Sequence, residues 1–361
     1  MIVALVLVGY AAVLGLAGPA ALRRSSWTAR APRLAIAAWQ VLSVSVLSSL
    51  VLAGLALAAP TAPFSTNLAV LLRTCLIAIE RGYATPGGAG AALAGLVLAT
   101  TVAGWSLGCL VTRLARSARD RDRHVQALSL VARAFEHPDT VVLDHGIPAA
   151  YCLSGRPPRV VLTSAALAAL DKPQLRAVLA HEEAHLAGHH HLVVGAAAAL
   201  HRAFPRVPLF VQAHKEIARL VELVADDVAA RRHGRFPVAA AMVTMAAGQA
   251  PSVALAAGGA GALERVRRLV GPAHPLGPGA QLASFATVIA LLFAPMLAAA
   301  SPALATARVP GFPAATAISR AAMGPNCHDP GMAVRPPRSQ RKREGGPGRR
   351  PEDQLLSSLV V

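Results

Sequence analysis

Long runs without a charged side chain dominate the hydrophobic pattern of this chain. Four of them are long enough to cross a bilayer, which takes about 20 apolar residues. They cover residues 1–22, 34–59, 89–112 and, within residues 278–305, residues 281–300. The first run has no basic segment before its apolar part, so we interpret it as a retained span and not as a signal peptide. The pattern therefore predicts a three-span region over residues 1–112 and a fourth span within residues 276–305.

Residues 113–275 have a different pattern, which is typical of a soluble α+β domain. Apolar positions at helical spacing predict a helix over residues 113–137 and another over residues 208–232. Short β-like runs lie at residues 140–143, 150–153 and 160–163, separated by Gly and Pro. Ser164 and Asp171 are candidate N-caps of two further helices, with Pro173 at the first position of the second. The predicted fold class is a multi-pass α-helical membrane protein with an inserted α+β domain.

The composition also favours a membrane protein. Apolar residues make up 54% of the chain, charged residues 15%, and the mean hydropathy is +0.49. A formal net charge of +17 would favour nucleic acid if the basic residues covered a folded surface. They lie instead beside the apolar runs and in residues 306–361, which favours contact with membrane lipids and no direct binding of nucleic acid. The four cysteines are scattered without a CxxC pair, so neither a disulfide framework nor a cysteine zinc site is expected.

Arginines beside the spans predict the orientation of the chain. One cluster lies between the first two spans (Arg23, Arg24, Arg30, Arg33), and another follows the third (Arg113, Arg116, Arg119, Arg121, Arg123). Because cytoplasmic loops carry an excess of Lys and Arg, we expect residues 113–275 in the cytoplasm, at the cell membrane. The loop over residues 60–88 then lies outside, with an apolar patch at residues 68–79 that is a candidate interfacial helix. Residues 306–361 are rich in Pro, Gly and Arg and are predicted to be disordered; their side of the membrane stays open.

The candidate chemistry lies in the sequence His181-Glu182-Glu183-Ala184-His185. On a helix, residues four apart share one face, so both imidazoles can reach one metal ion. Glu182 lies beside them, where it can accept the proton of an attacking water molecule. Zinc would act as the Lewis acid. The motif predicts a metallopeptidase with one Zn²⁺ per chain.

A catalytic zinc usually has three protein ligands, and several side chains could be the third. The candidates are His189, His190, His191, His201, His214, Glu216, Glu222, Asp226 and Asp227. Glu222 and Asp226 share one face of the helix predicted over residues 208–232, so they could be a ligand and an acceptor for a ligand histidine, or simply surface acids. The three consecutive histidines could form a second metal site or a solvated turn. Arg219 could pair with a carboxylate, help to stabilise an oxyanion or simply lie at the surface, and Glu183 is expected at the surface.

The segment 158–185 and the sequence Glu222-Leu-Val-Ala-Asp226 together resemble the gluzincin membrane peptidases. The similarity is greatest to the BlaR/MecR-type antibiotic-sensing metallopeptidases, with the HtpX-type proteases as relatives. The resemblance implies that Glu222 is the third zinc ligand, that Asp226 holds a ligand histidine and that Glu182 is the general base. It also implies a substrate-binding edge strand, formed by Arg159, Val160, Val161, Leu162 and Thr163, to which a peptide adds as an extra strand.

The expected function is therefore that of a membrane-bound zinc endopeptidase. By the resemblance, its partner would be a cytoplasmic or membrane-proximal protein substrate, such as a transcriptional repressor in a signalling pathway. The segment after the fourth span is too short for the penicillin-binding sensor domain of BlaR/MecR receptors, so sensing of β-lactams by such a domain is not expected. One alternative is a zinc-binding membrane signal transducer that acts by binding without proteolysis. Another is a transporter or structural protein with a chance motif, although uncharged spans offer no ion path. The sequence predicts no oligomeric state.

Overall fold

Four long apolar helices account for the predicted spans. The computed structural model describes residues 2–58, 88–247, 259–272 and 276–307. The four helices are α1 (Ile2–Arg24), α2 (Pro32–Ala58), α4 (Gly88–Val131) and α12 (Pro278–Ala307). By length and composition, each contains a segment able to cross a membrane. The prediction of four apolar helices is confirmed, whereas the candidate interfacial helix at residues 68–79 and the segment 308–361 lie outside the described residues.

Small residues let two of these helices approach closely. Helix α2 packs against α1, α4 and α12. At its contact with α4, a Cβ atom added to Gly54 would lie 2.5 Å from the carbonyl oxygen of Gly95 and 3.0 Å from Cβ of Ala99. Only glycine fits there, in the manner of small-residue contacts between membrane helices. The contact therefore fixes the distance between α2 and α4.

Helix α4 is longer than the span and ends earlier than the sequence predicts. It passes residue 112 without a break and stops at Val131, so the helix expected to reach residue 137 is too long at its end. Arg133 and Ala134 form strand β1 instead, because their backbone pairs with Val142 and Val141 of the next strand. Sheet hydrogen bonds, which a local pattern does not encode, end the helix here.

The described part of the chain contains a four-stranded mixed sheet. Its strands are β1 (Arg133–Ala134), β2 (Thr140–Leu143), β3 (Ala150–Leu153) and β4 (Arg159–Thr163), in the order β1-β2-β4-β3. Strands β2 and β4 are parallel, and the other pairs are antiparallel. The three β-like runs are thus confirmed as strands. Strand β4 lies inside the sheet with a neighbour on each side.

The helices that follow the sheet have clear start signals. They are α5 (Ser164–Ala169), α6 (Lys172–Ala187), α7 (His190–Ala203), α8 (Pro208–His233), α9 (Arg235–Ala247) and α11 (Gly259–Val270). Asp171 caps α6 as predicted, in a capping box with Gln174. Pro173 is the second helical residue, and α5 is capped by Thr163, one residue before the predicted Ser164. The hydroxyl of Thr163 accepts from the backbone of Ala166, which makes it the cap.

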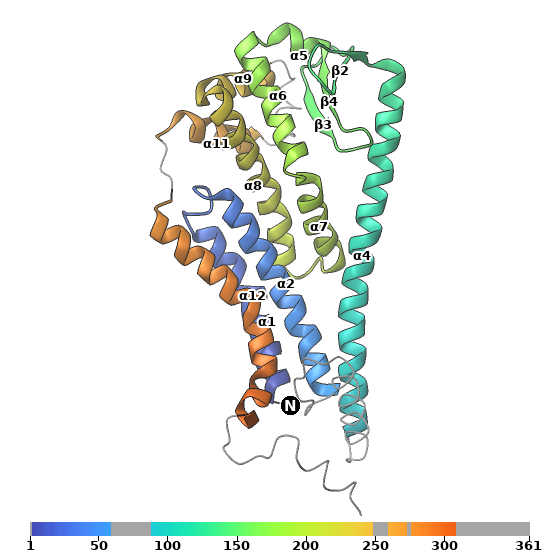
Figure 1. Ribbon diagram of the computed structural model, residues 1–361, viewed down its shortest axis with the longest axis vertical. Coiled ribbons are helices and arrows are strands. Elements are labelled where there is room, and N and C mark those ends of the chain that lie inside the picture. Colours follow the sequence, from blue (N-terminus) through green and yellow to red (C-terminus); the bar gives the residue numbers. More distant parts are fainter. Residues whose placement is uncertain (1, 59–87, 248–258, 273–275, 308–361) are drawn as a thin grey trace, which may run out of the picture. The chain divides into compact units, whose positions relative to one another are not determined.

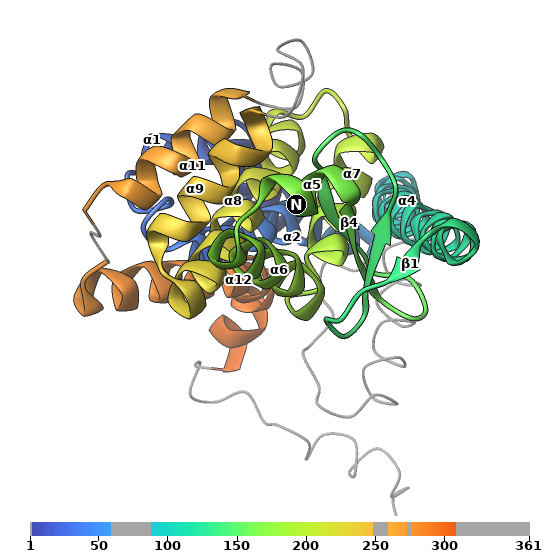
Figure 2. The same cartoon turned by 90° about the horizontal axis from the view of Figure 1, so that it is seen from above.

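The largest hydrophobic core is shared by the spans and the helices of residues 113–275. Trp39 and Leu42 of α2 pack with Phe210 and Ile217 of α8, and all four side chains are at most 3% exposed. Figures 1 and 2 show α6 and α8 side by side, with the sheet between α6 and the end of α4. The segment 113–275 is therefore not packed as a domain apart from the spans.

Candidate metal centre

Three side chains from two helices point their ligand atoms at one another. His181 and His185 lie one turn apart on α6, and Glu222 lies on α8. The Nε2 atoms of the two histidines are 3.1 Å apart, and each lies 3.5 Å from a carboxylate oxygen of Glu222. Zinc bonds of about 2.0–2.2 Å at tetrahedral angles place ligand atoms about 3.3 Å apart. These three residues form the one group of potential metal ligands found in the described part of the chain, and their spacing fits zinc.

Asp226 orients the first of these histidines. Its carboxylate is 1% exposed and lies 3.0 Å from Nδ1 of His181. The Nδ1–H group donates to this carboxylate, which leaves Nε2 of the ring for a metal ion. Glu222 is therefore a candidate ligand, and Asp226 accepts a hydrogen bond from the ligand His181. The two residues are not a pair of surface acids.

A cation that the sequence analysis did not single out completes this network. Arg265 of α11 donates from Nε and Nη2 to the two oxygens of Asp226, each at 2.7 Å. Its Nη1 lies 2.9 Å from Glu222. Leu269, one turn later, is buried in a core with residues of α6, α8 and α9, and this packing holds α11 in place. No spacing rule relates Arg265 to the motif, because it reaches the site from a separate helix.

The network shifts the pKa values of the residues in it. Burial alone would raise the pKa of Asp226, but hydrogen bonds from Arg265 and His181 outweigh it and lower this pKa to about 2. Burial alone would lower the pKa of His181, but hydrogen bonds to Asp226 and Glu222 raise it to about 9. The carboxylate is therefore ionised at neutral pH, and the imidazole loses a proton when its Nε2 binds a metal ion.

His190 contacts the second ligand, His185, as Asp226 contacts His181. Its Nδ1 lies 2.9 Å from Nδ1 of His185. With a proton on Nδ1, His185 donates to His190 and keeps its Nε2, which faces the other two ligands, for a metal ion. Burial lowers the pKa of His185 to about 4. Gly188 permits this approach, because a Cβ atom there would lie 2.5 Å from the His190 ring. Of the three consecutive histidines, His190 thus has a partner in the site, and no second metal group is found among the described residues.

Glu182 lies on the same helix next to the ligands and faces strand β3. Burial raises the pKa of its carboxyl group above the usual value. It accepts a hydrogen bond from the thiol of Cys152. Burial, together with the negative charge of Glu182, raises the pKa of that thiol to about 12, so it is a proton donor here and not a nucleophile. Sequence spacing gave no sign of Cys152, since it lies on another element.

The expectation that residues 159–163 form a free edge is wrong. Strand β4, which holds Arg159, Val160, Val161, Leu162 and Thr163, pairs with β2 on one side and β3 on the other. Its last four residues are buried, and Thr163 caps α5. The strand at the sheet margin on the α6 side is β3, which contacts that helix.

A cleft of about 810 Å³ opens beside the ligands. Its polar wall includes His181, Glu182, Glu222 and Arg265, and Ala150 of β3 lies at its margin. The rest of the wall is mainly apolar and comes from α6, α9 and α11, including Met242 and Leu263. A cleft of this size and composition suits a peptide with apolar side chains.

Glu183 and Arg219 form ion pairs outside the metal centre. Glu183 points away from the ligands and binds Arg232 at 2.9 Å. Arg219 pairs with Glu216 at 3.1 Å and with Glu264 at 2.8 Å. Of the interpretations of Arg219, the structure supports pairing with carboxylates.

The comparison with protein families agrees with this geometry. Residues 115–255, less than half of the chain, match the sequence model of Peptidase family M48. Neither a curated protein nor a solved structure is detectably similar to the chain. The matched segment contains both ligand histidines, Glu182, Glu222 and Asp226, but ends before Arg265. This match does not distinguish a similarity to BlaR/MecR-type peptidases from a similarity to HtpX-type proteases. The part of the chain that carries the candidate metal centre is thus similar to Peptidase family M48, a family of zinc metallopeptidases.

Proposed function

We propose that the protein is a membrane-bound zinc endopeptidase that hydrolyses peptide bonds of a protein substrate. The observation that carries this proposal is the triangle of ligand atoms from His181, His185 and Glu222, with the carboxylate of Glu182 beside it. The similarity of residues 115–255 to Peptidase family M48 supports it, and so do four helices that are apolar enough to cross a membrane.

The chain's own residues supply the acid–base part of the reaction. Zinc, when bound by His181, His185 and Glu222, supplies Lewis acidity for the scissile carbonyl and the attacking water. Glu182 accepts the proton of that water and returns it to the leaving amine. The raised pKa of Glu182 suits both transfers, and Cys152 holds its carboxylate toward the cleft by a hydrogen bond.

The geometry of the cleft favours an extended peptide as substrate. Strand β3 borders the cleft at Ala150 and pairs with β4 on one side only. A peptide that adds to β3 as a further strand would pass the ligand atoms and place alternate side chains against α9 and α11. We propose β3, in place of β4, as the substrate-binding strand.

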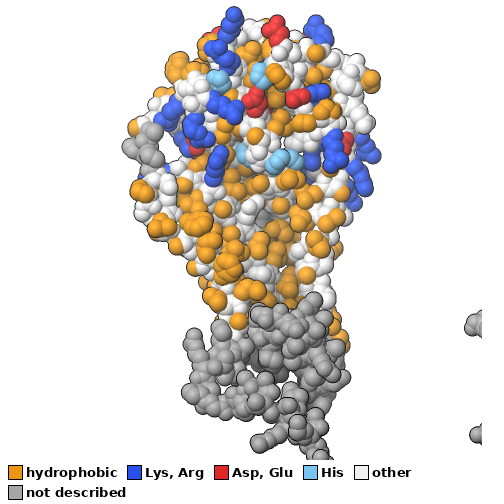
Figure 3. Space-filling model, viewed as in Figure 1, with side chains coloured by type: hydrophobic (Ala, Val, Ile, Leu, Met, Phe, Trp, Pro, Cys, Tyr) orange, Lys and Arg blue, Asp and Glu red, His pale blue; other side chains and the backbone are white. Residues whose placement is uncertain are grey.

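Charge supports a cytoplasmic site. Figure 3 shows Lys and Arg side chains gathered over the end that carries the sheet and α6, whereas hydrophobic side chains cover the spans. Arg23 and Arg24 end α1 at this side, and Arg33 begins α2. By the excess of positive charge in cytoplasmic loops, the site faces the cytoplasm, where a repressor or another membrane-proximal protein would be the substrate.

Glu182→Gln tests hydrolysis against the alternative of a signal transducer that binds zinc without proteolysis. The test uses the full chain in detergent, a peptide library and mass spectrometry of cleaved bonds, with zinc per chain measured alongside. We expect cleavage by the wild type and by the matched control Glu183→Gln, no cleavage by Glu182→Gln, and equal zinc in all three. Zinc in every variant without cleavage in any would favour the transducer. A folded wild type without zinc would overturn both.

A further inference from the structure

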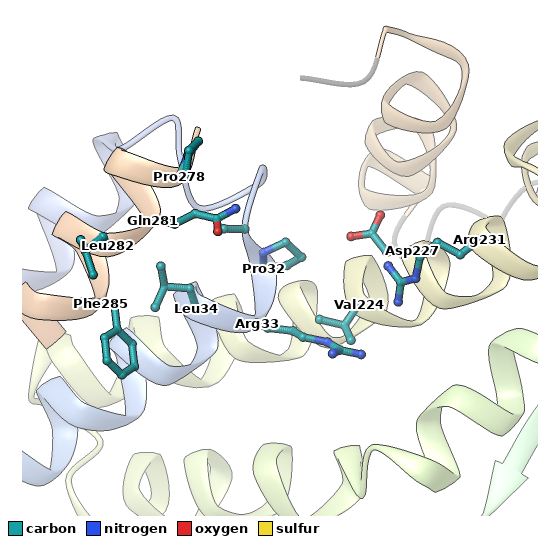
Figure 4. A pocket seen from close by; sticks show the side chains of 11 residues that line it. Pro32, Arg33, Leu34, Val224, Asp227, Arg231, Pro278, Gln281, Leu282 and Phe285 are labelled. Carbon is teal, nitrogen blue, oxygen red and sulfur yellow. The ribbon is translucent and has the colours of Figure 1, made fainter. Parts of the chain in front are cut away.

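A second cavity lies where the spans meet α8, away from the metal ligands. Its volume is about 810 Å³. Its walls come from the first turns of α2 and α12 and from the second half of α8. Figure 4 shows the guanidinium groups of Arg33 and Arg231 on the same side as Asp227, with Leu282 and Phe285 on the side of α12. The cavity therefore has a charged end and an apolar end.

The charged end holds two arginines without an anionic partner. Asp227 lies one turn before Arg231 on α8, at a spacing that allows an ion pair. Both oxygens of Asp227 are instead taken by Arg268 of α11, at 2.7 and 3.0 Å. Across the described residues, the side chains of Arg231 and Arg33 form no hydrogen bond or ion pair. Two unpaired guanidinium groups beside a neutralised carboxylate attract an anion, and their planar forks suit phosphate oxygens.

The apolar end is open to lipid. Leu282 is 69% exposed and Phe285 is 55% exposed, and both belong to the span α12. Leu34 of α2 and Val224 of α8 continue this apolar wall toward the arginines. A soluble anion would leave these side chains uncovered, whereas an acyl chain would cover them.

The position of the cavity matches the headgroup level of a bilayer. Helices α2 and α12, both able to cross a membrane, begin at Pro32 and Pro278, and both of these residues line it. The first backbone N–H groups of a helix carry a partial positive charge, which adds to the attraction of the arginines for an anion. Anionic lipids are concentrated in the cytoplasmic leaflet, the side on which the arginine clusters place this end of the spans.

We propose that this cavity binds one anionic phospholipid, with its phosphate between Arg33 and Arg231 and the upper part of an acyl chain along Leu282 and Phe285. None of the metal ligands lines this cavity, and the proposal does not depend on the peptidase activity. The bound lipid bridges the start of α12 to α8, the helix that carries Glu222 and Asp226.

Native mass spectrometry of the full-length, delipidated protein tests this site. Phosphatidylglycerol, phosphatidylcholine and glycerol 3-phosphate are titrated separately, and the dissociation constant is measured for each. We expect phosphatidylglycerol to bind at least tenfold more tightly than either of the others. The variant Arg33→Gln/Arg231→Gln should lose at least tenfold of its affinity for phosphatidylglycerol, and Phe285→Ser should weaken it severalfold.

The matched control is Arg116→Gln/Arg119→Gln, which removes two exposed arginines of α4 that do not line the cavity. It should bind phosphatidylglycerol as the wild type does. Equal losses in both double variants would overturn the site in favour of general surface charge. Equal binding of the two lipids would also overturn it, and tight binding of glycerol 3-phosphate would assign the cavity to a soluble anion. Zinc content and size-exclusion behaviour show whether a variant is misfolded. If the double variant is misfolded, the single variant Arg231→Gln replaces it, because this exposed side chain can be changed without disturbing the core.

Discussion

Asp226→Asn isolates the contribution of one buried carboxylate to the metal centre. In the wild type, this carboxylate accepts from Nδ1 of His181 at 3.0 Å and from two nitrogens of Arg265 at 2.7 Å. The asparagine amide keeps the shape of the carboxylate but loses its charge. Its NH₂ group would face the N–H donors of His181 and Arg265. Because the pKa of Asp226 is lowered to about 2, the wild-type side chain is fully ionised at pH 7, where the two proteins are compared.

Two effects of known size follow from these contacts. Loss of the group that orients a ligand histidine typically costs about 10–100-fold in metal affinity, which corresponds to about 1.4–2.7 kcal/mol. Breaking a buried ion pair costs about 3–5 kcal/mol of folding stability. Arg265 keeps Glu222 as a partner and is 19% exposed, so we expect a value near the lower limit.

Competition with a chelator of known affinity measures the zinc affinity, and denaturant unfolding of the zinc-free protein in detergent measures the stability. The neighbouring variant Asp227→Asn is the matched control, since it makes the same change at a carboxylate paired with Arg268 and outside the metal centre. We expect its zinc affinity to stay within about threefold of the wild type. An unchanged zinc affinity of Asp226→Asn, or a loss of equal size in Asp227→Asn, would rule out this role of Asp226 in the metal centre.

Three further predictions concern the protonation of one ligand and the packing of two glycines. Because the pKa of zinc-free His181 is raised to about 9, zinc must displace a proton from it, and the apparent zinc affinity should rise about tenfold per pH unit between pH 6 and 8. Calorimetry in buffers of different ionisation enthalpy should count about one proton released per zinc, and a flat profile would contradict the assignment. The Cβ atom of Gly188→Ala would push His190 from its ligand histidine, so the chelator assay should show about tenfold weaker zinc binding, and His190→Ala should reproduce the loss. Gly54→Leu overpacks the contact between α2 and α4 and should cost about 1–3 kcal/mol, seen as a lower melting temperature, whereas Gly104→Leu has open space and should not.

The parts of the site that follow from one helix could be predicted from the sequence. His181 and His185 share a face because four residues make about one turn, and the same spacing joins Glu222 to Asp226. Which of these acids binds the metal came from the resemblance and not from the spacing. The ligand geometry of the structure agrees with it.

The parts of the site that join different elements could not be predicted in this way. Arg265 of α11 reaches Glu222 and Asp226, and Cys152 of β3 reaches Glu182. The placement of both residues depends on how those elements pack. His190 belongs to a histidine run that looks like a solvated turn, and only its contact with His185 reveals its role. The prediction that β4 is an edge strand was wrong for the same reason. The order of strands in a sheet is a non-local property that a run of apolar residues does not encode.

Helix α8 packs against the spans and also carries part of the metal centre. Its first half places Phe210 and Ile217 in the core formed with α2, and its second half carries Glu222 and Asp226. Leu220, which is fully buried in the same core, lies two residues before Glu222. The position of the third ligand is therefore set by packing against the spans as much as by the helices around the motif. A fragment of residues 113–275 would expose this core to solvent at a cost of about 25 cal/mol per Å² of apolar surface. The metal centre is for this reason a property of the whole membrane-spanning chain, and its affinity for zinc should be measured on that chain.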